Sequence, residues 1–342
     1  MTNQLFLWNF IAKCLQRKSP CVLYVVVAAE KGTPGNPGFA MAVALNSTVN
    51  GAEPEVSGTV GGGIMEKNLQ EEAVNMLKSG QTLSFLRKLH HYKRPDGSVE
   101  ESGLICSGSQ TIGACTLLGE DLPTVKRIVT AIAESKPIRL QISQRGLATS
   151  SVSRSIPRFV LASAEEEDWQ YSELLGAPDT VVIAGGGHVG LALSRQMALL
   201  GFCVVVADDR ADVDTMRNNA FAKELHIASY QEFGEIVQRF LHRRVFVIIA
   251  TAAYKTDVEA LLSLSKTFTT PDKQRPEHIE YIGLMGSKAK ITTIFRDLRL
   301  VGVPEAWLKT VSAPIGVQIN SDTPEEIAVS IAAEIICVKN AR

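Results

Sequence analysis

Cysteine is scarce in this sequence, and no two cysteines have the spacing of a metal-binding pair. The chain has 342 residues and six cysteines. None of them forms a Cys-x-x-Cys pair, so the spacing predicts no metal site. No basic segment followed by an apolar stretch opens the chain, and no signal peptide is predicted. We therefore expect a cytoplasmic protein whose cysteines are free thiols rather than a disulfide framework.

Long apolar runs and excess charge are also missing. No apolar run approaches the ~18–20 residues that a membrane-spanning helix needs, so no membrane association is expected. The formal net charge is −1, which gives no reason to expect nucleic acid or an anionic membrane as a partner. A hydrophobic content of 45% with 21% charged residues is that of an ordinary soluble globular protein. The length favours two domains.

A glycine fingerprint stands in the second half. Residues 185–190 read Gly-Gly-Gly-His-Val-Gly, which is G-x-G-x-x-G. A predicted strand at 180–184 precedes it, and a predicted helix at 191–200 follows. A second predicted strand, 202–207, leads into an acidic residue about 20 residues on, as dinucleotide-binding folds require. The pattern predicts a site for a nucleotide or another ligand that bears a pyrophosphate. The alternative is that the glycines only pack the helix on the strand.

Each residue of the fingerprint has a predicted role. Gly185 permits a tight turn, Gly187 lets a ligand phosphate approach the backbone, and Gly190 lets the helix lie close to the strand. The free N–H groups and the positive end of the helix dipole favour an anion. Asp208, followed by Asp209 and Arg210, is placed to accept hydrogen bonds from ribose hydroxyls. For His188 two interpretations stay open, a residue that lines the ligand site and an incidental surface residue.

The whole second half alternates between predicted strands and helices. The strands are expected at 180–184, 202–207, 224–227, 244–250 and 279–283. This alternation predicts a parallel sheet with helices on its faces and a ligand site beyond the carboxyl ends of the strands.

Two helix starts in this half are marked by capping residues. Gly286, Ser287 and Lys288 follow the last predicted strand, and Ser287 is a good N-cap. This turn either holds a phosphate or simply caps the helix. Thr323-Pro324-Glu325-Glu326 is a capping box that opens the last helix.

In the first half, a helix is predicted at 5–17 and a long, doubly buried strand at 21–29. The turn-rich segment 31–38 joins this strand to a second one at 39–45, which makes a hairpin. Further strands are predicted at 82–90, 103–119, 138–142 and 158–161, and another helix at 123–134.

Three consecutive glycines, Gly61, Gly62 and Gly63, precede a helical run, and Glu66 lies in its first turn. This resembles a second helix N-terminus suited to an anion, and the alternative is a plain turn. Cys106 interrupts a predicted strand. It is either a functional thiol or a small buried apolar group. His90 and His91 are adjacent in a predicted strand and point to opposite faces, so no metal site is predicted.

The acidic run 165–168 indicates a solvated connection. We therefore predict a first domain at 1–165, a linker at 166–178 and a second domain at 179–342.

Taken together, these separated motifs resemble the XdhC/CoxI accessory proteins, which are maturation factors of xanthine dehydrogenase and related molybdenum hydroxylases. In the second half the resemblance rests on residues 183–190, 207–210, 281–288, 313–316 and 323–330. In the first half it rests on Gly32-Thr33-Pro34, Gly38 with Met41, Gly58 to Gly63 with Glu66, and Cys106.

The resemblance implies a smaller α/β XdhC/CoxI domain followed by a Rossmann domain. It implies a chaperone-like accessory factor, rather than an established enzyme, that binds the molybdenum cofactor in its molybdopterin form. Such a factor protects the cofactor during sulfuration and helps to insert it into an apo-molybdenum hydroxylase. A cysteine desulfurase is a further implied partner, and a homodimer is expected. Cys106 is the candidate thiol that approaches the metal or its sulfur. The predicted cofactor-binding residues are Gly185, Gly187, His188, Gly190, Asp208, Asp209, Arg210, Gly61, Gly62, Gly63, Glu66, Gly286, Ser287 and Lys288.

The sequence departs from the usual pattern of that family at three positions. Gly35 stands where an arginine is common, Ser107 where a glycine is common, and Ala252 where a histidine is common. Two other functions also remain open. The Rossmann half alone would fit an NAD(P)-dependent oxidoreductase, although spacing singles out no histidine or lysine of the first domain as a proton donor. The other possible function is that of a nucleotide-sensing protein that regulates partner assembly. Fold alone cannot choose among these functions.

Overall fold

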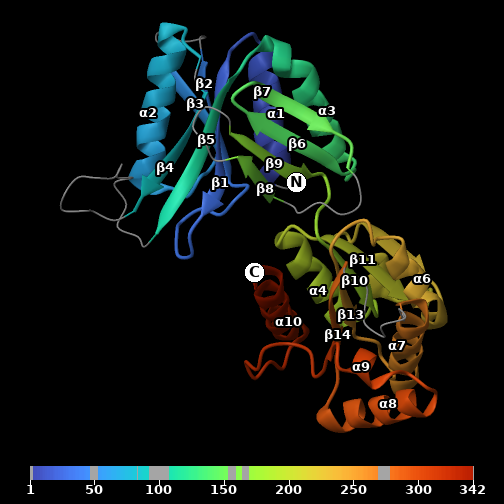
Figure 1. Ribbon diagram of the computed structural model, residues 1–342. Helices are drawn as coiled ribbons and strands as arrows, with labels where there is room; N and C mark the ends of the chain where they lie inside the picture. Colours follow the sequence, from blue (N-terminus) through green and yellow to red (C-terminus); the bar gives the residue numbers. More distant parts are fainter. Residues whose placement is uncertain are drawn as a thin grey trace. The chain divides into compact units, whose positions relative to one another are not determined.

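A computed structural model of the chain describes residues 3–46, 53–82, 84–91, 108–152, 159–163, 169–268 and 278–341. The chain divides into two compact units, Met1–Ala177 and Pro178–Arg342 (Figure 1). The units are of nearly equal length, whereas the family resemblance implied a smaller first domain. Each unit is described by itself below.

The first unit contains a five-stranded antiparallel sheet in the order β3-β2-β1-β5-β4. The predicted hairpin is confirmed, since β1 pairs with β2 over residues that bracket the turn-rich segment. The strand bounds are β1 Cys21–Ala29, β2 Ala40–Asn46, β3 Glu53–Gly58, β4 Ser84–His90 and β5 Ser109–Leu117.

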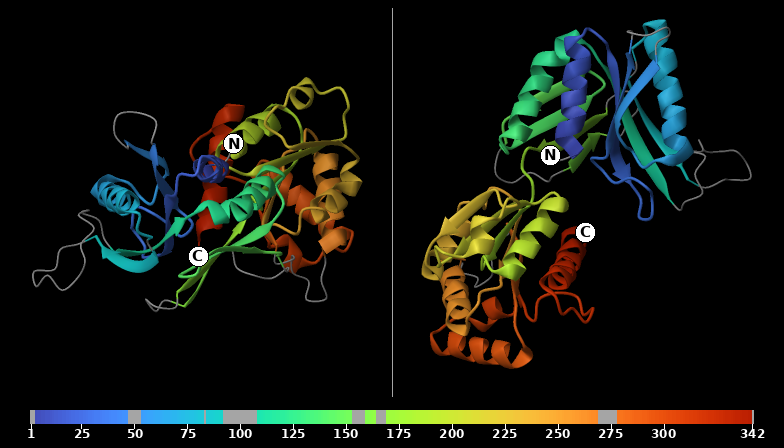
Figure 2. Two further views of the ribbon diagram at one scale, coloured as in Figure 1. Left: turned by 90° about the horizontal axis from the view of Figure 1, so that it is seen from above. Right: turned by 180° about the vertical axis from the view of Figure 1, so that it is seen from behind.

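The central strand β1 is buried on both faces, as its continuous apolar sequence predicts. Val22 and Tyr24 pack beneath α2 (Gly63–Ser79) on one face. Leu23 and Val25 pack on the other face with residues of α1 (Asn3–Gln16) and α3 (Leu122–Ala133). The helices α1 and α3 lie side by side (Figure 2). The 3₁₀ turn η1 (Gly119–Asp121) leads into α3.

A second antiparallel sheet, in the order β7-β6-β9-β8, completes the first unit. Its strands are β6 Ile138–Ser143, β7 Gly146–Ser150, β8 Phe159–Ser163 and β9 Gln170–Leu175. The predicted linker at 166–178 is therefore corrected, because β9 lies within it. Its residues alternate, with Tyr171, Glu173 and Leu175 buried, and this period of two is the signal of a half-buried strand.

The second unit contains a six-stranded parallel sheet in the order β12-β11-β10-β13-β14-β15. This confirms the predicted Rossmann-like sheet and is the strand order of dinucleotide-binding folds. The direction of winding reverses between β10 and β13, and ligands of such sheets bind at the carboxyl ends of the strands near that point. The bounds are β10 Thr180–Ala184, β11 Cys203–Asp208, β12 Glu224–Ile227, β13 Val245–Ile249, β14 Ile279–Leu284 and β15 Val311–Ser312.

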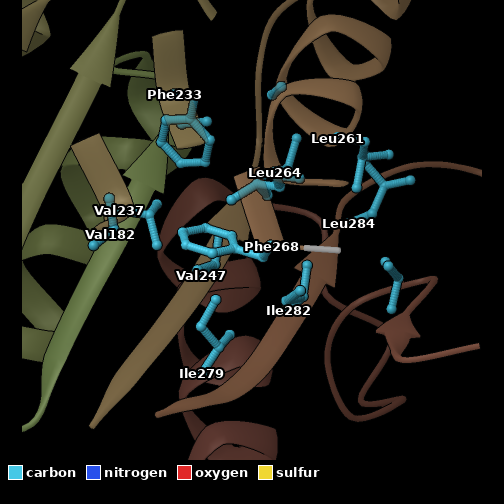
Figure 3. Packing of buried hydrophobic residues seen from close by; sticks show 14 of the residues in the cluster. Val182, Phe233, Val237, Val247, Leu261, Leu264, Phe268, Ile279, Ile282 and Leu284 are labelled. Atoms are coloured by element: carbon cyan, nitrogen blue, oxygen red, sulfur yellow. The ribbon is translucent and has the colours of Figure 1, made fainter. Parts of the chain in front are cut away.

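Alternate residues of each parallel strand face opposite layers of helices. Val181 and Ile183 pack against α4 (His188–Leu199) and α10 (Pro324–Asn340), which lie side by side (Figure 1). Val182 faces the other layer, where Phe233 and Leu264 reach the sheet (Figure 3). The helices of that layer are α6 Phe233–Gln238, α7 Tyr254–Phe268, α8 Lys288–Leu300 and α9 Glu305–Leu308, and the remaining short elements are α5 Asp214–Arg217 and η2 Tyr230–Glu232.

Two further expectations concern membranes and thiols. Within the described parts of the chain, no helix has both the length and the apolar character needed to cross a bilayer. Cys14, Cys21, Cys115 and Cys203 are buried free thiols, and Cys337 is an exposed one. Cys106, the candidate functional thiol, lies outside the described residues, as does Ser107.

Candidate functional site

The glycine fingerprint forms the turn between β10 and α4. Gly185 has φ +115°, and a Cβ at this position would lie 2.3 Å from the carbonyl oxygen of Ala250. A Cβ at Gly190 would lie 2.0 Å from the carbonyl oxygen of Gly185. Both positions therefore require glycine, the first for the tight turn and the second for close packing of the helix. These are the conformational roles that the sequence predicts for them.

Gly187 has a different environment. It is the N-cap of α4. Among the described residues, no side chain caps the helix there, and no atom lies within 4 Å of a Cβ placed on Gly187. The next residue, His188, is exposed. Open space therefore adjoins the start of α4, where the first N–H groups of a helix have no intrahelical partner, and a ligand phosphate would need such space.

Asp208 ends β11 and ties that strand to the glycine turn. Its carboxylate is fully buried. Oδ2 accepts from the backbone N–H of Gly186 at 2.7 Å and from Nη2 of Arg210 at 2.9 Å. Oδ1 accepts from the backbone N–H and from Nε of Arg210 at 3.0 and 2.9 Å. A carboxylate has about four lone-pair positions, so the chain itself fills all of them. A ribose could reach Asp208 only by displacing Arg210.

Burial by itself would raise the pKa of Asp208. Hydrogen bonds from the Arg210 side chain and from the Gly186 N–H outweigh burial and hold this pKa below its usual value. The side-chain hydrogen bonds to Asp208 in turn raise the pKa of Arg210. The two groups therefore stay charged as an ion pair at neutral pH. Asp209 is exposed and makes no hydrogen bond or ion pair with any described residue, so it is the carboxylate at this strand end that remains available to a ligand.

A second polar cluster lies beyond β13. Asp257, in the first turn of α7, is fully buried. Oγ1 of Thr251 donates to its Oδ1 at 2.5 Å, and Nζ of Lys290 lies 2.5 Å from its Oδ2. Burial raises the pKa of Asp257, and the hydrogen bonds from Lys290 and Thr251 oppose that shift in part. The ion pair connects α7 to α8.

Sequence reasoning did not include this pair. No local pattern in the sequence connects Thr251 or Asp257 to Lys290. One signal was present. Lys290 lies in the first turn of α8, where the helix dipole disfavours a cation, and the carboxylate of Asp257 offsets that effect.

The turn after β14 has the cap that the sequence predicts. Oγ of Ser287 accepts from the backbone N–H of Lys290 at 3.3 Å and caps α8. Lys288 is exposed and forms no ion pair within the described residues. It lines a hollow of about 310 Å³ together with residues of the segment after β15.

In the first unit, the amides of the glycine turn are already engaged. Oε1 of Glu66 accepts from the backbone N–H groups of Val60, Gly61 and Gly62 at 2.8, 3.1 and 2.6 Å, and also from the hydroxyl of Thr59. The turn therefore has the anion-holding geometry that the sequence predicts, but the anion is the protein's own carboxylate. A ligand phosphate would have to displace Glu66 to bind these amides.

Three motif segments of the first unit meet around Gln110. This side chain is fully buried, and its Nε2 donates to the carbonyl oxygens of Gly35 and Val60, at 3.1 Å each. A Cβ on Gly35 would lie 2.2 Å from the carbonyl oxygen of Val60. No side chain fits at Gly35 in this packing, so an arginine there would require the turn to shift.

His91 lies at the edge of the same cluster. Its backbone N–H donates to the carbonyl of Gly108 at 3.1 Å. The ring is fully buried, and burial lowers its pKa. Among the residues that the structure describes, no group of three or more His, Cys, Asp or Glu side chains could hold a metal ion.

The predicted site residues thus fall into two sets. Those of the second unit gather at the carboxyl edge of the parallel sheet, around the glycine turn, Asp208 and Lys288. Those of the first unit gather at the turn that Glu66 fills.

Two family models match this chain. The model of the XdhC Rossmann domain matches residues 181–335. The model of the XdhC and CoxI family matches residues 14–92. The two models match the two units separately.

Two curated relatives are similar to part of the chain. The uncharacterized protein YqeB of Escherichia coli strain K12 is 34% identical over 166 residues, which are 48% of this chain and 28% of that protein. A probable xanthine dehydrogenase subunit of Bacillus subtilis strain 168 is 26% identical over 185 residues, which are 54% of this chain and 50% of that protein. The chain thus spans half or less of the length of these relatives.

A solved structure has the same fold along the whole chain. The crystal structure described as a xanthine dehydrogenase from Bacillus halodurans matches with a TM-score of 0.67 and 20% sequence identity, over 100% of this chain and 97% of that chain. At this identity, the match shows a shared fold.

Proposed function

The chain belongs to the XdhC/CoxI family, and we propose that it assists the maturation of a xanthine dehydrogenase-type molybdenum hydroxylase by holding the molybdenum cofactor. A relative named as a probable xanthine dehydrogenase subunit supports the link to such an enzyme. We further propose that the protein protects the cofactor during sulfuration and delivers it to the apo-hydroxylase.

One observation carries the proposal of a phosphorylated ligand. The N-terminus of α4 lies at the switch point of the sheet, Gly187 leaves open space beside it, and no side chain of the described residues caps its N–H groups. The molybdenum cofactor carries a phosphate in its molybdopterin form and a pyrophosphate in its dinucleotide form. Both groups suit backbone N–H donors at a helix N-terminus.

The residues present fit such a group in the second unit. The N–H groups of Gly187, His188 and Val189 would hold the phosphate. Asp208 would fix the turn through Gly186, and Asp209 would accept from the ribose of a dinucleotide form. When bound, the cofactor supplies the molybdenum centre that the hydroxylase needs for its reaction. The role of Cys106 as a thiol near that centre remains a prediction.

The glycine turn of the first unit is less suited to a ligand phosphate than the turn before α4. Both glycine turns present backbone amides to an anion, but Glu66 already occupies those of Val60, Gly61 and Gly62. We therefore place the phosphate at α4 and not at the turn of the first unit.

Cofactor transfer tests the proposed function directly. The purified protein would be loaded with molybdenum cofactor under anaerobic conditions and mixed with an apo-hydroxylase. We expect the hydroxylase to gain activity faster, and to a higher final level, than with the same amount of free cofactor. Equal activation with and without the protein would contradict the proposal.

An NAD(P)-dependent oxidoreductase is the second candidate, because the strand order and the glycine turn also fit a dinucleotide. It predicts saturable NAD(P)H binding with turnover of a substrate. The proposed accessory factor predicts no turnover of NAD(P)H in the presence of the apo-hydroxylase.

A further inference from the structure

A hollow at the carboxyl edge of the parallel sheet is not explained by a phosphate at α4. Its volume is about 310 Å³. Three segments that are distant in sequence line it, namely the turn after β14, the segment after β15, and α10. The lining residues that matter here are Lys288, Ile315, Val317, Ile319 and Ser330.

The wall of this hollow is preformed. The backbone N–H of Ile315 donates to the carbonyl of Leu284 at 3.0 Å. Oγ of Ser330, on α10, donates to the carbonyl of Val317 at 2.7 Å, and the N–H of Val317 donates back to the carbonyl of Ser330 at 3.2 Å. The N–H of Gly316 donates to the carboxylate of Glu334, also on α10. The segment after β15 is thereby fixed to both the sheet and the helix.

The rest of the segment has unused hydrogen-bonding capacity. Residues 318–321 line the hollow, and within the described chain no hydrogen bond to their backbone or side chains is found. Apolar side chains lie beside these polar groups, since Val317 is 41% and Ile319 is 47% exposed. Lys288 adds one cation that has no acidic partner in the described residues. Apolar contact area with a few convergent polar groups is the usual character of a small-molecule site.

The hollow lies on the same edge of the sheet as the N-terminus of α4. Counted along the sheet, β14 is two strands and β15 three strands away from β10. With neighbouring strands ~4.8 Å apart, this separation is about 10–15 Å. The two positions are therefore near enough for one ligand to be considered for both.

We propose that this hollow binds the heteroaromatic ring of the ligand whose phosphate lies at α4. The inference rests on the proposed function and adds the ring subsite to it. Val317 and Ile319 contact the face of the ring. The Lys288 ammonium donates to a ring carbonyl or ring nitrogen, and the free backbone groups of residues 318–321 pair with the remaining polar atoms of the ring edge. The ring is therefore polar, like a pterin, and not a plain hydrocarbon ring.

Binding of a stable fluorescent pterin, with and without a phosphate on its side chain, tests the proposal. The variants are Lys288→Ala, Ile319→Ala and Gly187→Val. The matched control is Lys266→Ala, which removes an exposed lysine from the last turn of α7, at the opposite edge of the sheet. Thermal unfolding of each variant confirms that it folds.

Lys288→Ala and Ile319→Ala should each weaken binding of both pterins, and Lys288→Ala by about tenfold, the loss typical of one hydrogen bond from a charged group. Gly187→Val should weaken binding of the phosphorylated pterin only, and Lys266→Ala should bind both like the wild type.

If Lys288→Ala and Ile319→Ala bind both pterins like the wild type while Gly187→Val no longer binds the phosphorylated pterin, the ring subsite is wrong and the phosphate site stands. If the wild-type protein binds neither pterin, the proposed function fails as well. If the two variants instead lose only affinity for the apo-hydroxylase, the hollow is a protein-docking site and the inference is overturned.

Discussion

The backbone N–H of Gly186 donates to the buried Oδ2 of Asp208 at 2.7 Å, so the end of β11 fixes the conformation of the glycine turn after β10. The same carboxylate is held by Arg210 through its backbone N–H and its guanidinium. Asp208 therefore acts as a positioning residue for the turn that would receive a phosphate. The stability of the second unit therefore depends on the Asp208 carboxylate.

Replacing Asp208 by Asn should destabilise the second unit. The amide group cannot accept all four hydrogen bonds, and it leaves Arg210 without its ion-pair partner. A loss of about 2 kcal/mol in the free energy of unfolding is expected from the hydrogen bonds to a buried charged group. Urea unfolding monitored by circular dichroism measures it. Asp209→Asn is the matched control, because Asp209 is exposed and makes no ion pair with any described residue. An equal loss of stability in both variants would show that Asp208 has no special role.

The pH dependence of that loss follows from the lowered pKa of Asp208. A carboxyl whose pKa is lower in the folded state stabilises the fold above its unfolded pKa of ~3.9, and this contribution is lost as the pH falls through the folded pKa. The difference in unfolding free energy between wild type and Asp208→Asn should therefore be constant from about pH 5 to 8 and shrink below about pH 4. A difference that stays constant down to about pH 2 would contradict the ion pair.

Two alanine substitutions in the fingerprint should have opposite outcomes. A Cβ at Gly190 would meet the carbonyl oxygen of Gly185 at 2.0 Å, whereas a Cβ at Gly187 would meet no atom of the described residues within 4 Å. Gly190→Ala should cost about 3 kcal/mol or more, since backbone must shift to relieve the overlap. Gly187→Ala should change stability by less than about 0.5 kcal/mol. Chemical unfolding of the two variants under the same conditions measures both free energies of unfolding. Equal stabilities would show that the turn is not packed as described.

Removing the carboxylate of Glu66 should create an anion site in the first unit. In Glu66→Ala, the N–H groups of Val60, Gly61 and Gly62 lose their acceptor. The melting temperature of the variant should be lower than that of the wild type. Added inorganic phosphate should raise the melting temperature of the variant more than that of the wild type, because a ligand that binds the folded state stabilises that state. Glu71 is an exposed residue of the same helix, and phosphate should raise the melting temperature of Glu71→Ala no more than that of the wild type. The same response to phosphate in both variants would mean that the turn does not hold an anion.

Local patterns in the sequence predicted much of this fold. The run of apolar residues before Gly185, the glycines themselves and the capping residue Thr323 act over a few residues, and the structure has the strand, the turn and the capped helix where these patterns place them. The sequence does not predict strand β9, because the acidic run before it indicates a solvated connection, whereas the structure shows Tyr171, Glu173 and Leu175 buried in a strand.

The internal partners of the site could not be predicted in this way. The pair Asp257–Lys290 joins two helices from different parts of the second unit, and no local pattern states which residues meet after folding. Glu66 was expected in the first turn of its helix for the dipole, but its return to three consecutive amides depends on the positive φ angles of Gly61 and Gly62. Likewise, the spacing placed Asp208 at the ligand end of β11 but gave no sign that Arg210 and Gly186 would use all its acceptors.

Anaerobic equilibrium dialysis of the molybdenum cofactor against wild type and Gly187→Val tests the central claim most directly. A side chain at Gly187 enters open space and should leave the circular dichroism spectrum and the melting temperature near those of the wild type, yet it blocks the approach of a phosphate to α4. Gly119→Val is the control, because a Cβ on Gly119 would also meet no atom within 4 Å among the parts of the chain that the structure describes. Our account predicts that wild type and Gly119→Val bind the cofactor and that Gly187→Val loses at least about tenfold in affinity. Equal affinity in all three folded proteins, or no binding by the wild type, would contradict it.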